Sequence, residues 1–488
     1  MIFNSVTYLL YLVLVVSLFW VLPQRPRLWM IFLASLLFYG FWRPEFLVVM
    51  LVSAGTDFLV AQKMEACAVE RYRWRWLLVS LCINLGLLFY FKYLFFVLDN
   101  AVATLHFLGY QNLQKPVLNI VLPLGISFYT FQTISYSVDV YRKLIPAEKD
   151  IILYGCFVTF FPQLVAGPIL RGGELLGQLT AKPSFKLELF VSGLQRIIFG
   201  LFVKVVLADN IAPLVNSGFD QPVSNLSALD VLTLAFLFGF QIYFDFAGYS
   251  HIAIGSARLM GISFPENFNF PYISSSPREF WRRWHISLSS WIRDYLYLPL
   301  IGEKVRAQSS DGLAVAASSA AKKGYSPTIA LLLTWTIMGF WHGANWTYVM
   351  WGLIQGILVV IYRITAPTTA SFPLALRRIG GWMITLPLVM LAWIPFRAET
   401  VDLALGMYAK LISVNEWTYL GMRENIYLVT AILLLLTTGT YWVKQMLMPR
   451  LTGRLWASFL LHTLVLGLAV SLVFIFLRPI NQFIYFQF

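Results

Sequence analysis

The sequence predicts an all-α integral membrane protein, and three observations lead to this prediction. Apolar residues make up 59% of the 488 residues and charged residues only 12%, against roughly 25% charged residues in an average soluble protein. The mean hydropathy is +0.72. The apolar residues also form runs long enough to cross a hydrocarbon layer about 30 Å thick. Such uninterrupted runs satisfy their backbone hydrogen bonds as helices.

The runs follow one another along the whole chain, and we expect about eleven transmembrane helices with re-entrant or interfacial helices among them. The first run lacks the basic segment and cleavage site of a signal peptide, so we take it as a membrane helix. No soluble domain is visible, which predicts a single polytopic domain over residues 1–488. The runs lie near 5–22, 28–42, 44–61, 76–98, 116–138, 150–170, 187–208, 228–260, 327–365, 380–397, 425–446 and 456–477.

The charges predict the orientation of the chain. The net charge is +13, and such an excess in a membrane protein belongs to cytoplasmic loops and the anionic lipid surface. No compact basic domain is present, which argues against nucleic-acid binding. An outside N-terminus places nine basic residues in the early cytoplasmic loops and two in the outward loops. The nine are Arg25, Arg27, Lys63, Arg71, Arg73, Arg75, Arg142, Lys143 and Lys149, and the two are Arg43 and Lys115.

An aromatic and apolar stripe marks the stretch that follows Arg278. Its residues recur at steps of three and four, which predicts one helix with a buried face. His285 falls on that face, and the neighbouring arginines would suit a membrane interface or the phosphates of a donor. The stripe consists of Trp281, Trp284, Leu288, Trp291 and Tyr295.

The run 327–365 is long enough for two helices or a broken one, and so is 228–260. His342, Gly343, Ala344 and Asn345 stand in the middle of the former. Unwound backbone at that depth survives only where it lines a cavity. His342 and His285 are also the obvious proton-transfer groups with an ordinary pKa near neutrality. We interpret them as the reactive centre, although a packed core histidine would give the same pattern.

Other ionisable groups lie within apolar runs, where they usually face the protein interior. Asp245 and Tyr243 belong to a polar-aromatic segment that should border a polar core or serve in hydrogen bonds between helices. The three cysteines are odd in number and predict no disulfide framework. No cluster with metal-ligand spacing stands out. The remaining ionisable candidates in apolar runs are Lys92, Asp139, Lys204, Asp209, His251 and Arg397.

The stretch 308–323 is small and polar and is predicted to be a mobile loop at the cytoplasmic surface. Basic residues bound it, and we expect them to flank the cytoplasmic mouth of a tunnel that passes His342. They are Lys304, Arg306, Lys322 and Lys323.

Four blocks of this sequence resemble the membrane-bound O-acyltransferase family, specifically its bacterial polysaccharide branch. That branch includes the alginate and peptidoglycan O-acetylation membrane proteins and, more distantly, the teichoic acid D-alanyl transfer protein. The resemblance implies a funnel-shaped helical core, roughly residues 116–365. The blocks are 123–142, 160–169, 241–296 and 339–344.

The resemblance also implies a function and a set of site residues. His342 matches the catalytic histidine and His285 a second important histidine. The implied protein passes an acyl group, acetyl by preference, from acetyl-CoA or another thioester across the inner membrane, without a bound cofactor. A separate extracytoplasmic O-acetyltransferase would then modify a polysaccharide such as alginate. Weaker expectations of substrate or donor contacts fall on Asn345, Tyr243, Asp245, Trp281 and Arg282.

Two other classes of function remain open at this stage. One is an acyltransferase that acts directly on a lipid or small-molecule hydroxyl. The other is a transporter or flippase in which the histidines relay protons.

Overall fold

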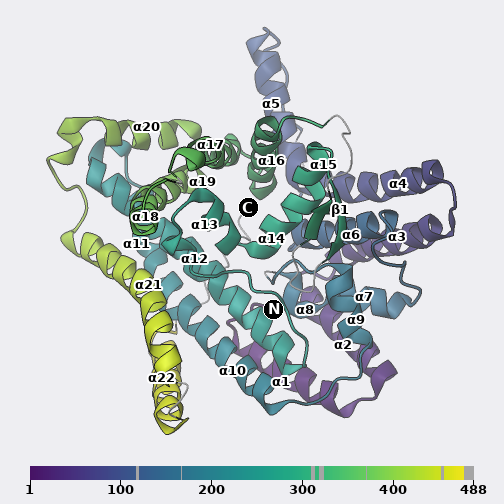
Figure 1. Cartoon of the computed structure of the whole chain (residues 1–488). Coiled ribbons are helices and arrows are strands. Elements are labelled where there is room, and N and C mark those ends of the chain that lie inside the picture. The colour runs from purple at the N-terminus through teal and green to yellow at the C-terminus, as the bar shows by residue number, and fades with distance from the viewer. Residues whose placement is uncertain are drawn as a thin grey trace.

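The computed structural model describes residues 1–116, 120–165, 167–308, 314–317, 324–369, 371–451 and 455–477. This part of the chain is almost entirely helical (Figure 1), which confirms the predicted class. The exception is a short antiparallel hairpin of β1 (Lys304–Gln308) and β2 (Ala314–Ala317). It occupies part of the stretch predicted to be a loop; the rest of that stretch, with Lys322 and Lys323, lies outside the described residues.

The first half of the chain forms eleven α-helices and two π-helical turns. They are α1 (Val6–Val21), α2 (Gln24–Gly40), α3 (Phe46–Ala66), α4 (Glu70–Leu88), η1 (Phe89–Tyr93), α5 (Leu94–Phe107), α6 (Ile126–Tyr141), α7 (Ile151–Thr159), α8 (Phe161–Leu164), α9 (Gly172–Thr180), α10 (Leu187–Leu201), η2 (Phe202–Ala208) and α11 (Asp209–Phe219).

The second half carries the conspicuous motifs. Its helical elements are η3 (Val223–Asn225), α12 (Ala228–Leu259), η4 (Pro271–Ile273), α13 (Pro277–Arg283), α14 (Ile286–Ile292), η5 (Arg293–Tyr297), α15 (Leu298–Leu300), α16 (Pro327–His342), α17 (Trp346–Thr369), α18 (Leu374–Ala392), α19 (Ile394–Arg397), α20 (Val401–Ile412), η6 (Val414–Trp417), α21 (Glu424–Leu451) and α22 (Leu455–Ile475).

Seven of the described helical segments are long and apolar enough to cross a membrane, and two shorter apolar helices accompany them. The predicted number of about eleven spans stays a prediction, because α1, α2, α6 and α16 have only 16 or 17 residues each. The seven segments are Phe46–Ala66, Glu70–Phe107, Leu187–Phe219, Ala228–Leu259, Trp346–Pro367, Leu374–Arg397 and Glu424–Met446.

The distribution of side chains is that of a protein in lipid. Large apolar residues such as Leu10 and Val13 of α1 lie outside, whereas polar groups are buried between helices. Asp57 of α3, for example, accepts hydrogen bonds from the hydroxyl of Ser137 (2.9 Å) and the amide of Asn84 (2.6 Å). Because lipid offers no hydrogen bonds, such groups must find partners inside the bundle. The chain is therefore a multi-pass membrane protein.

The run 228–260 forms a single unbroken helix, α12, which is 32 residues long. It crosses α10 closely at glycines. A methyl group on Gly200 would lie 2.6 Å from the carbonyl oxygen of Gly248, and one on Gly255 would lie 2.7 Å from that of Gly193. Small residues at a crossing let two helix backbones approach each other inside a membrane. The contact fixes α12 as the helix against which the central elements pack.

The run 327–365 does break where the sequence predicted. Helix α16 ends at His342 and α17 begins at Trp346. The two helices then pack closely, because Gly339 and Gly352 leave room for the opposing backbone: a methyl group on Gly339 would lie 2.3 Å from the carbonyl oxygen of Tyr348. This packing holds the end of α16 in the interior of the protein.

The prediction of one continuous helix along the tryptophan stripe was wrong. The stretch forms two short helices, α13 and α14, with Trp284 and His285 between them. His285 has a φ of 41°, in the left-handed region that rarely suits a side chain. The stripe is nonetheless buried at Trp281, Trp284 and Trp291. Figure 1 shows α13, α14 and α16 converging near the centre of the molecule.

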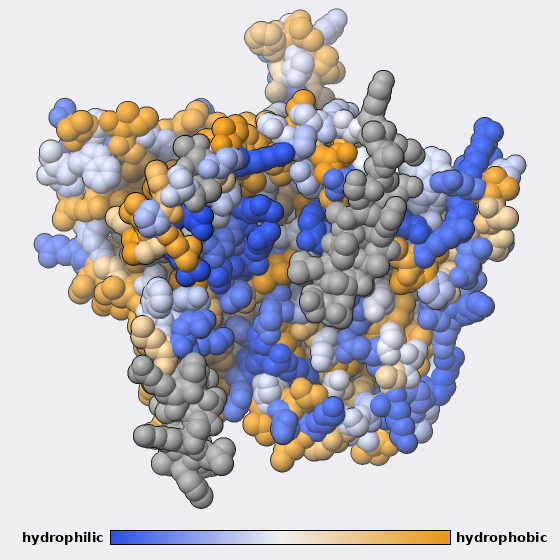
Figure 2. Space-filling model, in the orientation of Figure 1, coloured by the Kyte–Doolittle hydropathy of each residue, from blue (hydrophilic) through white to orange (hydrophobic). Residues whose placement is uncertain are grey.

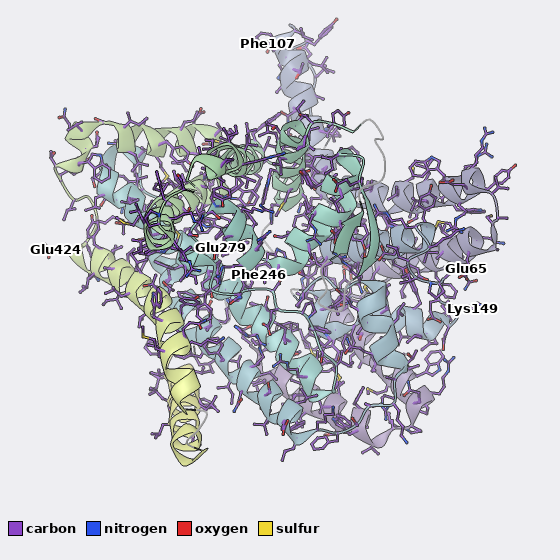
Figure 3. All side chains as sticks on the ribbon, viewed as in Figure 1. Glu65, Phe107, Lys149, Phe246, Glu279 and Glu424 are labelled. Carbon is purple, nitrogen blue, oxygen red and sulfur yellow. The ribbon has the colours of Figure 1, made fainter. Side chains whose placement is uncertain are left out.

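Three loops predicted to be basic and cytoplasmic lie at one end of the structure. A carboxylate oxygen of Glu65, at the end of α3, accepts a hydrogen bond from the backbone of Ala147 (3.2 Å). Asp150 forms an ion pair with Arg25, at the start of α2. Figure 3 shows Glu65 and Lys149 near each other at one edge of the molecule. The three loops, which carry all nine of the basic residues, are thus held together by direct contacts.

Hydrophilic side chains occupy two areas in Figure 2. One lies along the edge where α3 and α4 meet, and the other lies in the middle of the face shown. Orange apolar side chains gather along the opposite margin, around α18 and α20. The polar area in the middle lies over the region where the central helices converge.

Candidate active site

His342 is the last residue of α16 and is 4% exposed. Its ring lies against those of Trp351 (5.0 Å between centroids) and Phe396 (5.2 Å). Gly343 then continues in an extended conformation, which ends the helix directly after the histidine. The histidine is thus fixed at a helix end by aromatic rings from α17 and α19.

His285 lies in the break between α13 and α14 and is 1% exposed. Its ring packs edge-on against Phe246 of α12 (4.5 Å between centroids). Neither ring nitrogen has a hydrogen-bond partner in the described part of the chain. A buried polar group without a partner costs about 1–3 kcal/mol, and a left-handed residue costs a similar amount. Two such costs at one residue are typical of a functional position.

The structure brings the two histidines to the same place. Phe128 of α6 contacts both His285 (6.4 Å between centroids) and Trp341 (6.2 Å), the neighbour of His342. The imidazoles lie within electrostatic range of each other, so a charge on one would act on the other. The prediction that both line one site therefore agrees with the geometry, although their roles stay a prediction.

Buried hydrogen-bond donors without partners gather around His342. The indole N–H groups of Trp341, Trp351 and Trp393 have no acceptor among the described residues. The rings of Trp351 and Trp393 stack with centroids 5.7 Å apart. Indole N–H groups donate but do not accept, so the surroundings of His342 are rich in donors for an oxygen atom. Neither Trp351 nor Trp393 was predicted from the sequence to be a site residue, because a tryptophan in an apolar helix gives no signal of its own.

Trp281 and Arg282, two weaker candidates, have different positions. Trp281 is buried, donates to the side chain of Gln355 (3.3 Å) and contacts Trp351 at 6.0 Å, so it belongs to the wall around His342. Arg282 is exposed. The amide nitrogen of Gln355 is a further buried donor without a described acceptor.

Asn345 has a structural task. Its side-chain oxygen accepts a hydrogen bond from the backbone of Thr347 (3.1 Å), and its amide donates to the carbonyl oxygen of Glu399 (3.1 Å). The first contact lies at the start of α17, and the second joins that start to the chain after α19. The amide is therefore engaged in the fold, and the expected contact of Asn345 with the acyl donor stays a prediction.

Asp245 and Tyr243 also serve packing between helices. The carboxylate of Asp245 lies 2.6 Å from the ammonium nitrogen of Lys204, which also contacts Asp209 at 2.7 Å. A buried charge in lipid requires such a partner. Tyr243 packs among Phe268, Tyr272 and Trp284. The segment borders a polar interior, as predicted, but its acidic group is paired away from the histidines.

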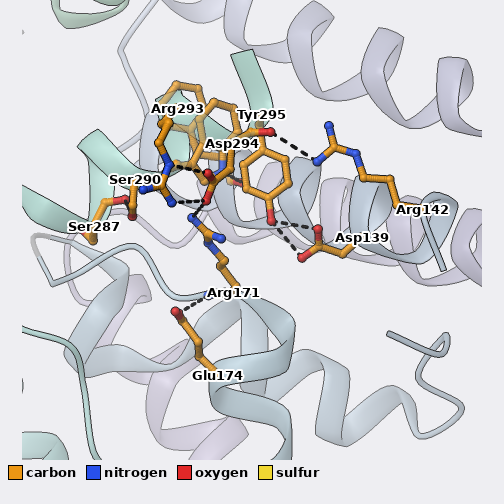
Figure 4. Close-up of polar contacts among 11 residues, drawn as sticks. Asp139, Arg142, Arg171, Glu174, Ser287, Ser290, Arg293, Asp294 and Tyr295 are labelled. Atoms are coloured by element: carbon orange, nitrogen blue, oxygen red, sulfur yellow. Dashed lines mark hydrogen bonds and ion pairs between the residues drawn. The ribbon is translucent and has the colours of Figure 1, made fainter. Parts of the chain in front are cut away.

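A second polar network lies beside the site, on the chain that follows α14 (Figure 4). The buried carboxylate of Asp294 pairs with Arg171 (2.6 Å) and Arg293 (2.7 Å). The hydroxyl of Tyr295 donates to both carboxylate oxygens of Asp139 (2.9 and 2.8 Å). These contacts join the end of α14 to α6 and to the start of α9. His285 directly precedes α14, so the contacts hold its segment in place at the C-terminal end.

The remaining sequence-predicted candidates lie elsewhere or outside the description. The Nδ1 atom of His251 accepts a hydrogen bond from Arg196 (3.1 Å), which also forms an ion pair with Glu266. The side chains of Lys304 and Arg306 are outside the described residues, so their expected place at a tunnel mouth stays a prediction.

The fold and the site together define a polytopic membrane protein with two histidines enclosed in its helical core. Comparison with known proteins gives the family. The sequence pattern of the membrane-bound O-acyltransferase family matches residues 143–396, and this chain belongs to that family.

Individual relatives extend the match over most of the chain. A protein of Azotobacter vinelandii named "Probable alginate O-acetylase AlgI" is 36% identical over 459 residues, which cover 93% of this chain and 87% of the relative. The peptidoglycan O-acetyltransferase of Helicobacter pylori is 36% identical and the match covers 80% of this chain and 75% of the relative. The teichoic acid D-alanyltransferase of Streptococcus thermophilus is 32% identical, and the match covers 49% of this chain and 56% of the relative.

Proposed function

We propose that this protein transfers an acetyl group from a cytoplasmic thioester to the extracytoplasmic side, for O-acetylation of a polysaccharide. Family membership supports acyl transfer. The observation that carries the site is the buried imidazole of His285, whose two nitrogens have no partner among the described residues, within electrostatic range of His342. The names of the relatives, alginate O-acetylase and peptidoglycan O-acetyltransferase, support a polysaccharide as the final acceptor.

The two histidines have separate tasks in this proposal. The imidazole of His342 takes the proton of the accepting hydroxyl, whose oxygen attacks the thioester carbonyl carbon. His285 donates a hydrogen bond to the carbonyl oxygen, which becomes negative as the new C–O bond forms. The C–S bond then breaks, and the thiolate receives the proton held by His342. Each atom transferred is accounted for, and no further reactant is required.

Trp351 is a donor placed to assist, because its ring contacts that of His342 directly. We expect Trp351→Phe to lower kcat by about 10²-fold, in line with the loss of one donor to a developing oxyanion, since the indole N–H has no other described acceptor. The initial rate of acetyl transfer measures this. Trp346→Phe is the control, because Trp346 is exposed and donates to Asn100. Equal rates for the two variants would contradict the assignment.

Orientation follows from the basic loops gathered at one end. We propose that this end faces the cytoplasm and that the N-terminus lies outside, in the inner membrane of a bacterium. Cys67, half-exposed between α3 and α4, is a natural probe. In a Cys82→Ser background, an impermeant maleimide should label Cys67 only after spheroplasts are permeabilised.

The loop at the other end of α3 supplies the control for this labelling. Arg43 is exposed there, so Arg43→Cys should be labelled on intact spheroplasts of a Cys67→Ser, Cys82→Ser variant. Labelling of Cys67 in intact spheroplasts would reverse the orientation.

The partner and the donor are part of the proposal. Acetyl-CoA is the thioester that we would test first, and a separate extracytoplasmic O-acetyltransferase would complete the transfer to the sugar. Purified protein in vesicles should release CoA thiol from acetyl-CoA on one side and pass labelled acetyl to an added acceptor on the other. Acetyl transfer to a lipid hydroxyl without a partner would favour the direct acyltransferase, and substrate movement without thioester cleavage would favour a transporter.

A further inference from the structure

Lys92 is a cation inside an apolar segment of the bundle. It lies in η1, the π-helical turn that joins α4 to α5. Single π-helical turns inside a long helix are often found at functional sites, because they turn a side chain out of the regular helical register. A charge at this depth is costly unless the protein supplies a partner. The partner of Lys92 therefore shows what the residue is for.

The partners are the last two carbonyl groups of α16. The ammonium nitrogen of Lys92 donates to the carbonyl oxygen of Trp341 (2.6 Å) and to that of His342 (3.0 Å). The last carbonyl oxygens of a helix accept no hydrogen bond from within that helix, and they form the negative end of the helix dipole. Lys92 thus caps the C-terminus of α16 at His342, the candidate base.

Neighbouring contacts hold Lys92 in place. The ring of Tyr93 stacks on that of Phe340 with centroids 4.5 Å apart, and the ammonium group lies 5.7 Å from the ring centre of Trp341. Both contacts join η1 to the last turn of α16. The whole π-helical turn is therefore fastened to the end of that helix, although some 249 residues separate the two in the chain.

A purely structural ion pair would look different. Lys204, a buried lysine in the other described π-helical turn that carries a lysine, contacts two carboxylates, those of Asp209 and Asp245. Lys92 has no carboxylate within ion-pair distance in the described part of the chain. Its charge is directed at backbone carbonyls, and it lies within electrostatic range of the His342 ring.

We propose that Lys92 is a positioning residue that fixes the backbone of Trp341 and His342, and with it the orientation of the His342 imidazole for acyl transfer. The inference rests on the proposed role of His342. Misplacement of a reacting group by about 1 Å can cost roughly 10²-fold in rate.

The test compares Lys92→Met, which keeps the length and removes the charge, with Lys115→Met. Lys115 forms an ion pair with Asp99 of α5, at the surface. Purified variants are assayed for acetyl-CoA cleavage and for thermal unfolding in the same detergent. We expect kcat of Lys92→Met to fall by about 10- to 100-fold with KM for acetyl-CoA unchanged, and Lys115→Met to behave as the original protein. Lys92→Arg, which keeps the charge and the donors, should recover part of the loss.

Wild-type kcat in Lys92→Met would overturn the inference. If that variant does not fold, Lys92→Gln decides by the same criteria, because its amide keeps one donor to a carbonyl. His342→Ala is assayed in parallel. An active His342→Ala would refute the proposed site itself, whereas an inactive His342→Ala beside a fully active Lys92→Met would refute only the role of Lys92.

Discussion

Replacement of His342 by alanine is expected to lower acyl transfer by about 10²- to 10⁴-fold, the usual contribution of a general base. The ring ends α16 and contacts Trp341, Trp351 and Phe396. Removing it deletes the imidazole that we propose takes the proton beside these indole donors. Initial rates of labelled acetyl transfer from acetyl-CoA would measure the effect.

Stability must be measured with the same protein. A buried ring leaves a cavity, so the midpoint of thermal unfolding is expected to fall, but the variant should still insert and purify as a folded protein. His106→Ala is the matched control, since His106 is a half-buried histidine near the end of α5 whose Nε2 atom hydrogen-bonds to the carbonyl oxygen of Leu113 (2.9 Å). Activity in His342→Ala within a factor of two of the original protein would show that His342 is not the general base.

Replacement of His285 should have the second largest effect, and the left-handed backbone offers an unusually clean test. Glycine adopts a φ of 41° without steric cost. His285→Gly should therefore lose about 10²-fold in kcat, by loss of a donor to the carbonyl oxygen, while the relief of backbone strain offsets part of the lost packing against Phe246. Kinetic assays measure the loss in kcat, and thermal unfolding measures the net change in stability.

Asparagine separates the backbone from the side chain at this position. It also tolerates the left-handed region and carries an amide that can donate, but it reaches less far than imidazole. We expect His285→Asn to keep more activity than His285→Gly. Full activity in the glycine variant would show that the break between α13 and α14 matters and that the imidazole does not.

Much of the architecture was readable from the chain because it depends on local composition. A run such as 327–365 is apolar over a length that only a helix in lipid explains, and Gly343 within it predicted the break that the structure shows. Periodicity was less informative at the tryptophan stripe. The spacing of Trp281, Trp284 and Trp291 fits one helix, but the chain turns at His285. All three tryptophans are still buried, because the two short helices pack against the same core and turn their tryptophans toward it.

The membrane class, the family and the two histidines as the candidate reactive pair could be predicted from the chain alone, since these rest on composition and on motifs within single segments. What surrounds the histidines became clear from the packing of the helices. It paired Asp245 with Lys204, engaged Asn345 in starting α17, and placed Lys92 on the carbonyls of α16. Each of these contacts joins groups whose partners no local pattern specifies, because in lipid a buried charge is satisfied by whichever helix packs beside it.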